Sequence, residues 1–504
     1  MLTNIITGLS GSFEPYNFMM LLCGVFVGVV FGALPGLTGV MAIALFIPFT
    51  YSLDLIPAIL FLVGIYNGSV FGGSITAILV KVPGDTGNAA TVFDGYAMAQ
   101  KGEAGKALGI AAVTSSIGGI FASLILLFLA PLLADVAVTF GPAEYFAMAF
   151  MGLSAITSLG VNNQLKSITS CIIGLVLACI GMDAITGADR LTFGSPFLQD
   201  GIPLVPALIG LFAFSELFKQ INDGIQDGEA LVKNVSTKLP SLNELWQLRK
   251  TIFKSSIIGT WIGILPGAGA TLASFLGYTE AVRSSKKPEE FGTGIAEGVA
   301  AAETANNAAV GGSFIPTLAL GIPGSGSTAL LLSALTLHGI RTGPMIFVQQ
   351  PKMVYTIIIG VLLTNFIFLF MGVWGTRYFG KLLEIPYNIL FPTIVTFTIV
   401  GSYAVRNNIG DLWLMFGMGV IGYLLLIKGG FPVAPIILGL VLGPLTEMNF
   451  RRAYLLNGDL MGIITRPIAG TLILFSIIFL LSPLSKKIIS GIKTEKLKEA
   501  SSVD

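Results

Sequence analysis

The chain carries a pair of glycine- and proline-rich signatures twice, and each copy interrupts an apolar stretch. Residues 31–39 read FGALPGLTG and are followed at residues 68–87 by GSVFGGSITAILVKVPGDTG. The second copy reads IGILPGAGA at residues 262–270 and NAAVGGSFIPTLALGIPGSG at residues 307–326. Helix breakers at matching places in two apolar halves are the best sequence indication of a secondary transporter's binding site, because broken helices expose backbone groups. The duplication therefore indicates transport.

Aligning the two copies pairs their helix breaks and also places Asn67 opposite Asn306. Backbone exposed at such breaks persists in a membrane only when it is buried in protein or lines a wet cavity. We therefore expect the breaks to lie inside the protein. The predicted breaks are Pro35, Gly36, Pro83, Gly84, Pro266, Gly267, Pro323 and Gly324.

The composition independently requires a membrane. Of 504 residues 54% are hydrophobic and only 11% are charged, which is too apolar for a water-soluble fold of ordinary surface-to-volume ratio. Apolar stretches recur along the whole length, and strand patterns of the membrane-barrel type are not evident. The sequence predicts an all-α polytopic membrane protein with about 10–14 transmembrane or re-entrant helices.

The charges indicate sidedness more than they indicate partners. A net charge of +1 without a basic, aromatic-rich patch gives no case for nucleic-acid binding. The positive-inside bias would make the basic clusters cytoplasmic, although charges that merely mark solvated loops on either face remain an alternative. With three scattered cysteines and one histidine, we expect no cofactor and no metal site beyond a coupling ion. The clusters are Lys81, Lys101 and Lys106; residues 219–254; Arg283, Lys286 and Lys287; and residues 486–498.

These charges suggest a two-repeat organisation. Residues 1–220 form a first transmembrane repeat, 221–251 a polar cytoplasmic connector, and 252–450 a second repeat. A final transmembrane helix and a basic cytoplasmic tail occupy residues 451–504. Because the uncharged N-terminus would begin outside and the second repeat inside, the repeats are predicted to be inverted.

Residues 254–283 form an apolar run interrupted near its middle, with basic residues at both ends. Each arm would reach only about 18 Å, short of a bilayer core of about 30 Å. A re-entrant hairpin therefore fits better than a single kinked helix, which remains the alternative.

The same motifs resemble a known family. GALPGLTG, FGGSITAILVKVPGDTGNAATVFDGYAMAQKGEAGKALG and GTGIAEGVAAAETANNAAVGGSFIPTLALGIPGSGSTALLL are similar to the large membrane subunit (TctA) of tripartite tricarboxylate transporters, over residues of about 15 to 440. The resemblance implies an ion-driven carboxylate uptake system of the bacterial inner membrane. It also implies a small membrane subunit (TctB-like) and a periplasmic solute-binding protein (TctC-like). The substrate differs among members, so a citrate-like di- or tricarboxylate is the expected class.

The candidate substrate site combines two proline-glycine breaks, each followed by residue types that cap helices. A helix that begins at such a break presents free N–H groups and the positive end of its dipole to a carboxylate. The alternative is that the small polar residues serve helix packing. The predicted substrate-binding residues are Ser74, Thr76, Asp85, Thr86, Asn88, Asn307, Ser313, Ser325, Gly326, Ser327 and Thr328.

Few basic residues lie near the signatures, so co-transported cations would have to balance the substrate charge. Oxygen ligands suit Na⁺, whereas a buried carboxylate would suit H⁺; Na⁺ is the favoured coupling ion. The predicted cation ligands are Asn67, Asn306 and Glu303.

Other functions remain open. A passive anion channel, or a carrier working without a binding protein, would need no driving cation or no soluble partner. A remote alternative is an intramembrane serine protease in which His338 activates Ser74 or Ser313, but the histidine is not duplicated and no GxSxG motif surrounds either serine. The chain is therefore predicted not to be an enzyme.

Overall fold

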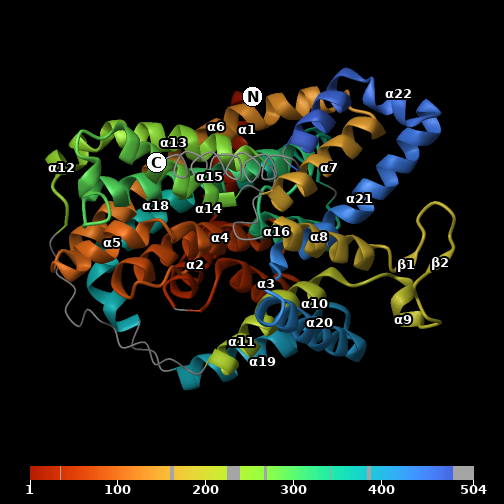
Figure 1. Ribbon diagram of the computed structural model, residues 1–504, viewed down its shortest axis with the longest axis horizontal. Coiled ribbons are helices and arrows are strands. Elements are labelled where there is room, and N and C mark those ends of the chain that lie inside the picture. Colours follow the sequence, from red (N-terminus) through yellow and green to blue (C-terminus); the bar gives the residue numbers. More distant parts are fainter. Residues whose placement is uncertain are drawn as a thin grey trace, which may run out of the picture. The chain divides into compact units, whose positions relative to one another are not determined.

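The computed structural model describes residues 1–34, 36–158, 164–223, 239–265, 269–340, 342–382, 387–478 and 480, which are almost entirely helical (Figure 1). Among the described helices, six are long and apolar enough to cross a membrane: α2 (Pro15–Gly32), α4 (Leu55–Leu79), α6 (Ala104–Ala137), α18 (Pro351–Leu382), α20 (Ile409–Ile427) and α21 (Val433–Asn457). The described residues also contain four shorter apolar helices: α3 (Gly39–Thr50), α8 (Gln164–Ala178), α16 (Gly326–Leu337) and Pro467–Ile478. The predicted all-α polytopic membrane fold is confirmed; the inverted relation between the repeats stays a prediction.

Two compact units, interleaved along the sequence, make up the chain: Met1–Thr139 with Pro203–Gly429, and Phe140–Ile202 with Gly430–Asp504. Each unit therefore draws on both halves of the chain. The first unit contains α1 (Leu2–Ser12), α2 (Pro15–Gly32), α3 (Gly39–Thr50), α4 (Leu55–Leu79), η1 (Thr86–Asn88), α5 (Thr91–Gln100), α6 (Ala104–Ala137), α10 (Leu204–Leu208), η2 (Ile209–Phe214), α11 (Ser215–Asp223), α12 (Leu242–Gln247), α13 (Arg249–Ile264), α14 (Gly269–Ser284), η3 (Pro288–Glu290), α15 (Ala296–Leu320), α16 (Gly326–Leu337), α17 (Ile346–Gln349), α18 (Pro351–Leu382), α19 (Tyr387–Arg406) and α20 (Ile409–Ile427).

The predicted hairpin in residues 254–283 is confirmed. Helices α13 and α14 are 16 residues each and pack side by side. Lys254 Nζ lies 3.2 Å from Glu280 Oε1 and joins the two arms near their open end. A single kinked helix is therefore wrong. Pro266 and Gly267, at the expected tip, lie outside the described residues.

Helices α2 and α3 form the matching element of the first half. Gly36 has a φ of 81°, in the left-handed region that glycine adopts freely, and the Leu37 N–H donates to the Leu34 carbonyl oxygen over 3.1 Å. The chain thus reverses at the expected break, although Pro35 itself lies outside the described residues.

Each of these elements packs closely against a long, nearly buried helix: α2 against α4, and α13 against α15. A Cβ added to Gly32 would overlap the Ser69 carbonyl oxygen, and one added to Gly263 would overlap that of Ala309. These two glycines therefore set the backbone separation, as small residues do between membrane helices. The repeated signature produces the same packing twice.

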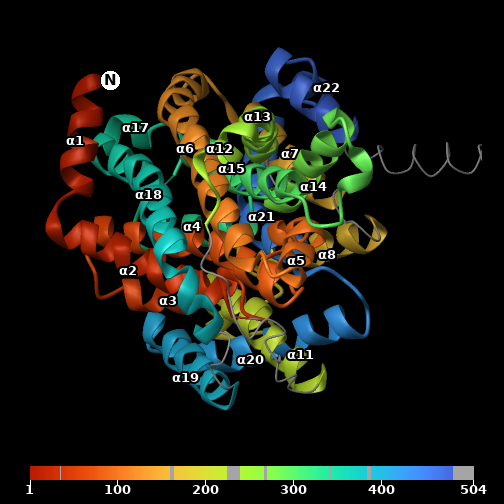
Figure 2. The same cartoon turned by 90° about the vertical axis from the view of Figure 1, so that its left-hand side faces the viewer.

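The outer helices enclose this centre. Helix α6 packs against α15, and α18 packs against α6, α4 and α1, as Figure 2 shows at one side of the molecule. Phe71 of α4 stacks on Phe368 of α18 with ring centroids 5.2 Å apart. The long helices α4 and α15 are thus kept away from lipid, which makes their polar side chains tolerable.

The second unit is a smaller helical group with a short antiparallel hairpin. Its elements are α7 (Pro142–Ser158), α8 (Gln164–Ala178), β1 (Gly181–Met182), β2 (Asp189–Arg190), α9 (Pro196–Gln199), α21 (Val433–Asn457) and α22 (Leu460–Ile464). Asp183 accepts backbone N–H bonds from Thr186 and Ile185 and one from Arg451, which together hold the pKa of that carboxyl well below its usual range. Arg190 also pairs with Glu447, so ion pairs fasten the hairpin to α21.

Candidate functional site at the two helix breaks

Helices α4 and α15, which contain the sequence Gly-Gly-Ser at residues 72–74 and 311–313, carry polar side chains into the protein interior. Asn67 is 4% exposed, and Glu303 and Asn306 are fully buried. Polar groups buried among apolar helices are costly unless they find partners or serve a ligand. The arrangement of their partners therefore decides what this region can bind.

The second break forms a well-capped helix start, as predicted. Gly321 ends α15 with a φ of 71°, and α16 begins after Ser325. The Thr328 N–H donates to Ser325 Oγ over 3.3 Å, and the Ser325 N–H donates to Thr328 Oγ1 over 2.8 Å. These two residues satisfy each other and leave the N–H groups of Gly326 and Ser327 at the positive end of a twelve-residue helix.

The first break differs from the prediction. After Lys81, whose φ is 64°, the chain makes only the three-residue turn η1 (Thr86–Asn88), and the next α-helix, α5, begins at Thr91. Asp85 Oδ1 accepts the Gly87 N–H over 3.3 Å, a local turn that competes with helix formation. Asp85 therefore caps a single turn, and no long helix dipole is available at this break.

Each break contacts a helix of the opposite half of the chain. The Tyr66 hydroxyl of α4 lies 3.0 Å from Ser325 Oγ and 3.4 Å from Ser313 Oγ. In the other direction, Thr271 of α14 donates to Thr86 Oγ1 over 2.7 Å. The duplicated signatures are therefore interlocked in one polar centre.

Glu303 is the hub of the first break. Its Oε1 accepts from Thr91 Oγ1 (2.5 Å) and Asn88 Nδ2 (3.0 Å), and its Oε2 accepts from Ser115 Oγ (2.9 Å). Asn307 Nδ2 donates to Ser115 Oγ over 2.8 Å and lies 3.5 Å from Glu303 Oε2. Over the described ranges no Lys, Arg or His forms an ion pair with Glu303, so neutral donors alone hold this carboxylate.

Two asparagine side chains at this break keep unused oxygens. Both side-chain atoms of Asn306 and the Oδ1 atom of Asn88 are buried without a hydrogen-bond partner among the described residues. Gly87 faces Asn306, and a Cβ added to Gly87 would overlap Asn306 Oδ1. Buried unpaired polar atoms are rare and call for an explanation such as a bound ion.

Other predicted residues bond within their own helices. Ser74 Oγ donates to the Phe71 carbonyl oxygen (2.7 Å), Thr76 Oγ1 to that of Gly73 (3.1 Å), and Asn67 Nδ2 to that of Val63 (3.1 Å). Ser313 Oγ donates to the Val310 carbonyl oxygen over 2.7 Å. Thr76 nevertheless lies beside the first break, because a Cβ added to Gly84 would overlap Thr76 Oγ1.

Four participants were missing from the predicted set: Tyr66, Thr91, Ser115 and Thr271. Tyr66 adjoins Asn67 and Thr91 follows the first break, so proximity to the signature was the available signal. Ser115 is one of many small residues in the apolar helix α6. Nothing local distinguishes it, because its partners are 188 and 192 residues away.

The serine protease alternative lacks its geometry in the described part of the chain. His338 Nε2 lies 3.4 Å from Thr50 Oγ1, whereas the hydroxyls of Ser74 and Ser313 bond to backbone carbonyls. A serine nucleophile requires a base within hydrogen-bond reach.

A polytopic helical membrane protein with two interlocked broken helices around a buried polar centre has the architecture of a secondary transporter. Sequence comparison gives the particular family: the chain belongs to the tripartite tricarboxylate transporter TctA family, whose model matches residues 18–438. It is therefore a membrane subunit of that transporter class.

Two relatives from Agrobacterium vitis are similar to the chain. An uncharacterised 52.8 kDa protein in the TAR-I ttuC' 3' region is 40% identical over 474 residues, covering 94% of both chains. An uncharacterised protein in the TAR-II ttuC' 3' region is 43% identical over 216 residues, covering 43% of this chain and 89% of the relative. No solved structure matches the chain.

Proposed function

We propose that this chain is the permease subunit that imports a citrate-like di- or tricarboxylate across the bacterial inner membrane. A cation gradient drives this import. Na⁺ is favoured over H⁺. The TctA membership supports two partners, a small membrane subunit and a periplasmic solute-binding protein that delivers the substrate.

The observation that carries this proposal is the contrast in chemistry between the two interlocked breaks. At the second break, the N–H groups of Gly326 and Ser327 point from the start of α16, beside the hydroxyls of Ser325 and Tyr66. Donors at a helix N-terminus suit a carboxylate. Ser313, which contacts the same Tyr66 hydroxyl, and Thr328, which bonds to Ser325, complete this substrate end.

The first break supplies the opposite chemistry. Asn88 donates its amide hydrogens to Glu303 Oε1 and to the Val70 carbonyl oxygen (3.1 Å), which leaves its Oδ1 free. The hydrogen bond from Asn88 Nδ2 to the Glu303 carboxyl group polarises the Asn88 amide. This polarisation makes Asn88 Oδ1 a better ligand for a cation. Together with Asn306 Oδ1 it offers neutral oxygens beside a buried negative charge, which suits a hard cation such as Na⁺.

The predicted residues divide accordingly. Asn88, Asn306 and Glu303 form the proposed cation end, and Asn307 links it to α6 through Ser115. Asn67 occupies the equivalent place of Asn306 in the first repeat and remains a second cation candidate. Asp85 and Thr86 remain candidates to bind the second carboxylate of the substrate or the cation that accompanies it. Ser74 and Thr76 are the least supported of the predicted substrate ligands, because their hydroxyls bond to carbonyl oxygens of their own helix.

The test is uptake in vesicles that contain this chain, its small subunit and its binding protein. Labelled citrate and succinate should accumulate only when an inward Na⁺ gradient is imposed and the binding protein is present. Equal flux without a gradient would indicate a passive channel, and undiminished high-affinity uptake without the binding protein would indicate an independent carrier.

A further inference from the structure

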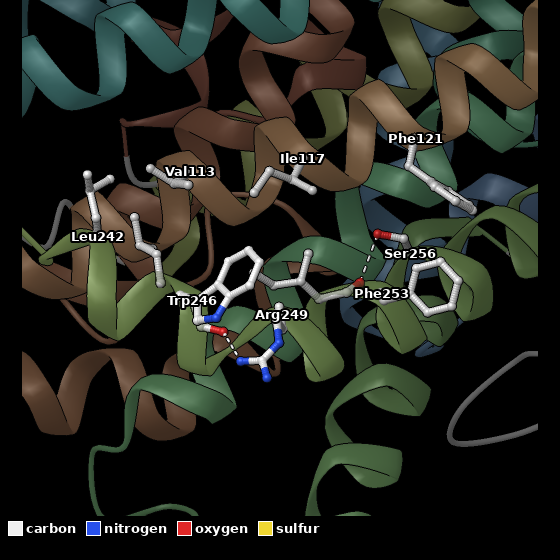
Figure 3. Close-up of a pocket in the computed structure, with 10 residues that line it drawn as sticks. Val113, Ile117, Phe121, Leu242, Trp246, Arg249, Phe253 and Ser256 are labelled. Atoms are coloured by element: carbon white, nitrogen blue, oxygen red, sulfur yellow. Dashed lines mark hydrogen bonds between the residues drawn. The ribbon is translucent and has the colours of Figure 1, made fainter.

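An apolar groove lies away from the polar centre, on the flank formed by α6, α12 and α13 (Figure 3). Its volume is about 510 Å³. Leu242 is 85% exposed and Trp246 is 66% exposed, and both line it. A wall this apolar is costly in water and is suited to contact with hydrocarbon.

The groove has a basic end and an aromatic end. Arg249 lines it and stacks on Trp246, with its guanidinium carbon 4.9 Å from the ring centroid. Phe121 and Phe253, with ring centroids 6.2 Å apart, meet edge to face at the other end, as Figure 3 shows. The Ser256 hydroxyl is already used, because it donates to the Ile252 carbonyl oxygen over 2.8 Å. The floor between the two ends is therefore apolar throughout.

The charges around the basic end do not cancel. Lys106 pairs with Glu244 at 2.6 Å and Lys254 pairs with Glu280 at 3.2 Å. Arg249 and Lys250 are exposed and form no ion pair within the described ranges. Arg249 donates one hydrogen bond, to the Trp246 carbonyl oxygen (2.8 Å), whereas a guanidinium carries five N–H donors. Arg249 thus brings a positive charge to a hydrocarbon-like groove, and Lys250, its neighbour in the chain, is exposed beside it without lining the groove.

We propose that this groove binds one anionic phospholipid, with an acyl chain against α6 and α13 and the phosphate at Arg249 and Lys250. Trp246 has the amphipathic character that places tryptophan at the membrane interface, and basic pockets between membrane helices bind anionic headgroups. The choice of a lipid over a protein helix rests on this charge complementarity.

A second groove supplies an internal comparison. It has a similar volume, about 500 Å³, and lies between α2 and α18, lined by residues that include Phe26, Trp374 and Tyr378. None of its lining residues is charged. Any lipid held there should be insensitive to headgroup charge, so a preference for anionic lipid would have to come from the first groove.

The experiment is native mass spectrometry of the purified chain incubated with equal amounts of phosphatidylglycerol and phosphatidylcholine. The wild type should retain phosphatidylglycerol preferentially. Arg249→Gln and Lys250→Gln should each lower that preference about fivefold. Arg283→Gln, a basic exposed position on α14, is the matched control and should leave it unchanged.

Filling the groove gives an independent arm. Val113→Trp should reduce retention of the preferred lipid while the melting temperature stays near that of the wild type. An unchanged phosphatidylglycerol preference in Arg249→Gln and Lys250→Gln would overturn the proposal. So would a photo-crosslinker at position 253 that reacts with the small membrane subunit instead of lipid in the assembled transporter.

Discussion

The two helix breaks occupy equivalent places in the sequence but are built differently. The second break, after α15, starts a twelve-residue helix capped reciprocally by Ser325 and Thr328. The first break, after α4, makes a three-residue turn whose Asn88 is bonded to a buried carboxylate. One signature therefore yields a cluster of N–H donors, and the other yields unpaired amide oxygens on residues that adjoin a buried carboxyl group. A few different side chains thus give the two copies of the motif different hydrogen-bonding partners.

Replacing the hub of the first break should have the largest effect. Glu303→Gln keeps the shape but removes the negative charge to which Thr91, Asn88 and Ser115 donate. Each hydrogen bond to a charged group contributes about 1.5–3 kcal/mol, so we expect Na⁺-driven uptake to fall at least about a hundredfold.

The matched control for this variant is Glu297→Gln on the same helix. Glu297 accepts a hydrogen bond from Thr251 (2.6 Å) and lies outside the polar centre. Uptake assays in proteoliposomes compare the two. Equal, mild losses in both variants would show that Glu303 has no special role in coupling.

At the second break, we expect a selective effect on substrate affinity. Ser325→Ala removes the helix cap and the contact with Tyr66, and Ser327→Ala removes a hydroxyl beside the free N–H groups. Each should weaken substrate affinity about ten- to hundredfold, with Ser325→Ala also costing about 1 kcal/mol of stability.

Ser333→Ala, on the same helix, is the control, because its hydroxyl bonds only to the Ala329 carbonyl oxygen in the described structure. Concentration dependence of uptake at saturating Na⁺ measures the effect. If Asn307→Ala, Ser325→Ala and Ser327→Ala all kept the wild-type affinity, the substrate site would lie elsewhere.

The space around two glycines, one next to each break, gives a smaller, structural contrast. A Cβ at Gly87 would overlap Asn306 Oδ1, whereas one at Gly326 would find its nearest neighbours at 3.7 and 3.9 Å. Gly87→Ala should therefore destabilise the protein by about 1–3 kcal/mol and weaken Na⁺ dependence, while Gly326→Ala should keep the wild-type melting temperature. Thermal melts of both variants in detergent check this, and the reverse order of stability would contradict it.

The smallest effect should arise outside the breaks, where α12 is tied to the start of α6. Lys106, together with the N–H and hydroxyl of Ser241, lowers the pKa of Glu244 from its ordinary 4.5 to about 2. Because the folded pKa lies below the unfolded one, this pair stabilises the fold above about pH 4.5 and loses that contribution as the pH falls towards 2. Both side chains are partly exposed, so the contribution is below about 1 kcal/mol.

Glu244→Gln should accordingly lower the melting temperature slightly at pH 6 and hardly at all near pH 2, with Na⁺ dependence of uptake unchanged. Glu290→Gln, which removes the more exposed pair with Lys287, is the control. A larger loss of stability for Glu244→Gln at low pH than at pH 6 would contradict this prediction.

The sequence predicts the hairpin and the start of α16, but not the turn at the first break or the contact of Ser115. The hairpin in residues 254–283 was predictable because each of its arms is too short to span the bilayer core. Ser325 and Thr328 are good capping residues three positions apart, so the start of α16 was predictable. Asp85 is an equally good capping residue, but it accepts the Gly87 N–H in a local turn and does not begin a long helix. Ser115 depends on a partner in the other half of the chain, and only the fold reveals such a contact.

The central claim, that the first break holds the cation and the second the carboxylate, is tested most directly by equilibrium binding of radioactive Na⁺ to the purified wild type, Asn306→Ala and Ser325→Ala. Removing the unpaired Asn306 amide should weaken Na⁺ binding about tenfold without loss of thermal stability, because that amide has no hydrogen bond to lose in the described structure. Ser325→Ala should bind Na⁺ as the wild type does. Unchanged Na⁺ affinity in Asn306→Ala, or a loss confined to Ser325→Ala, would contradict the account.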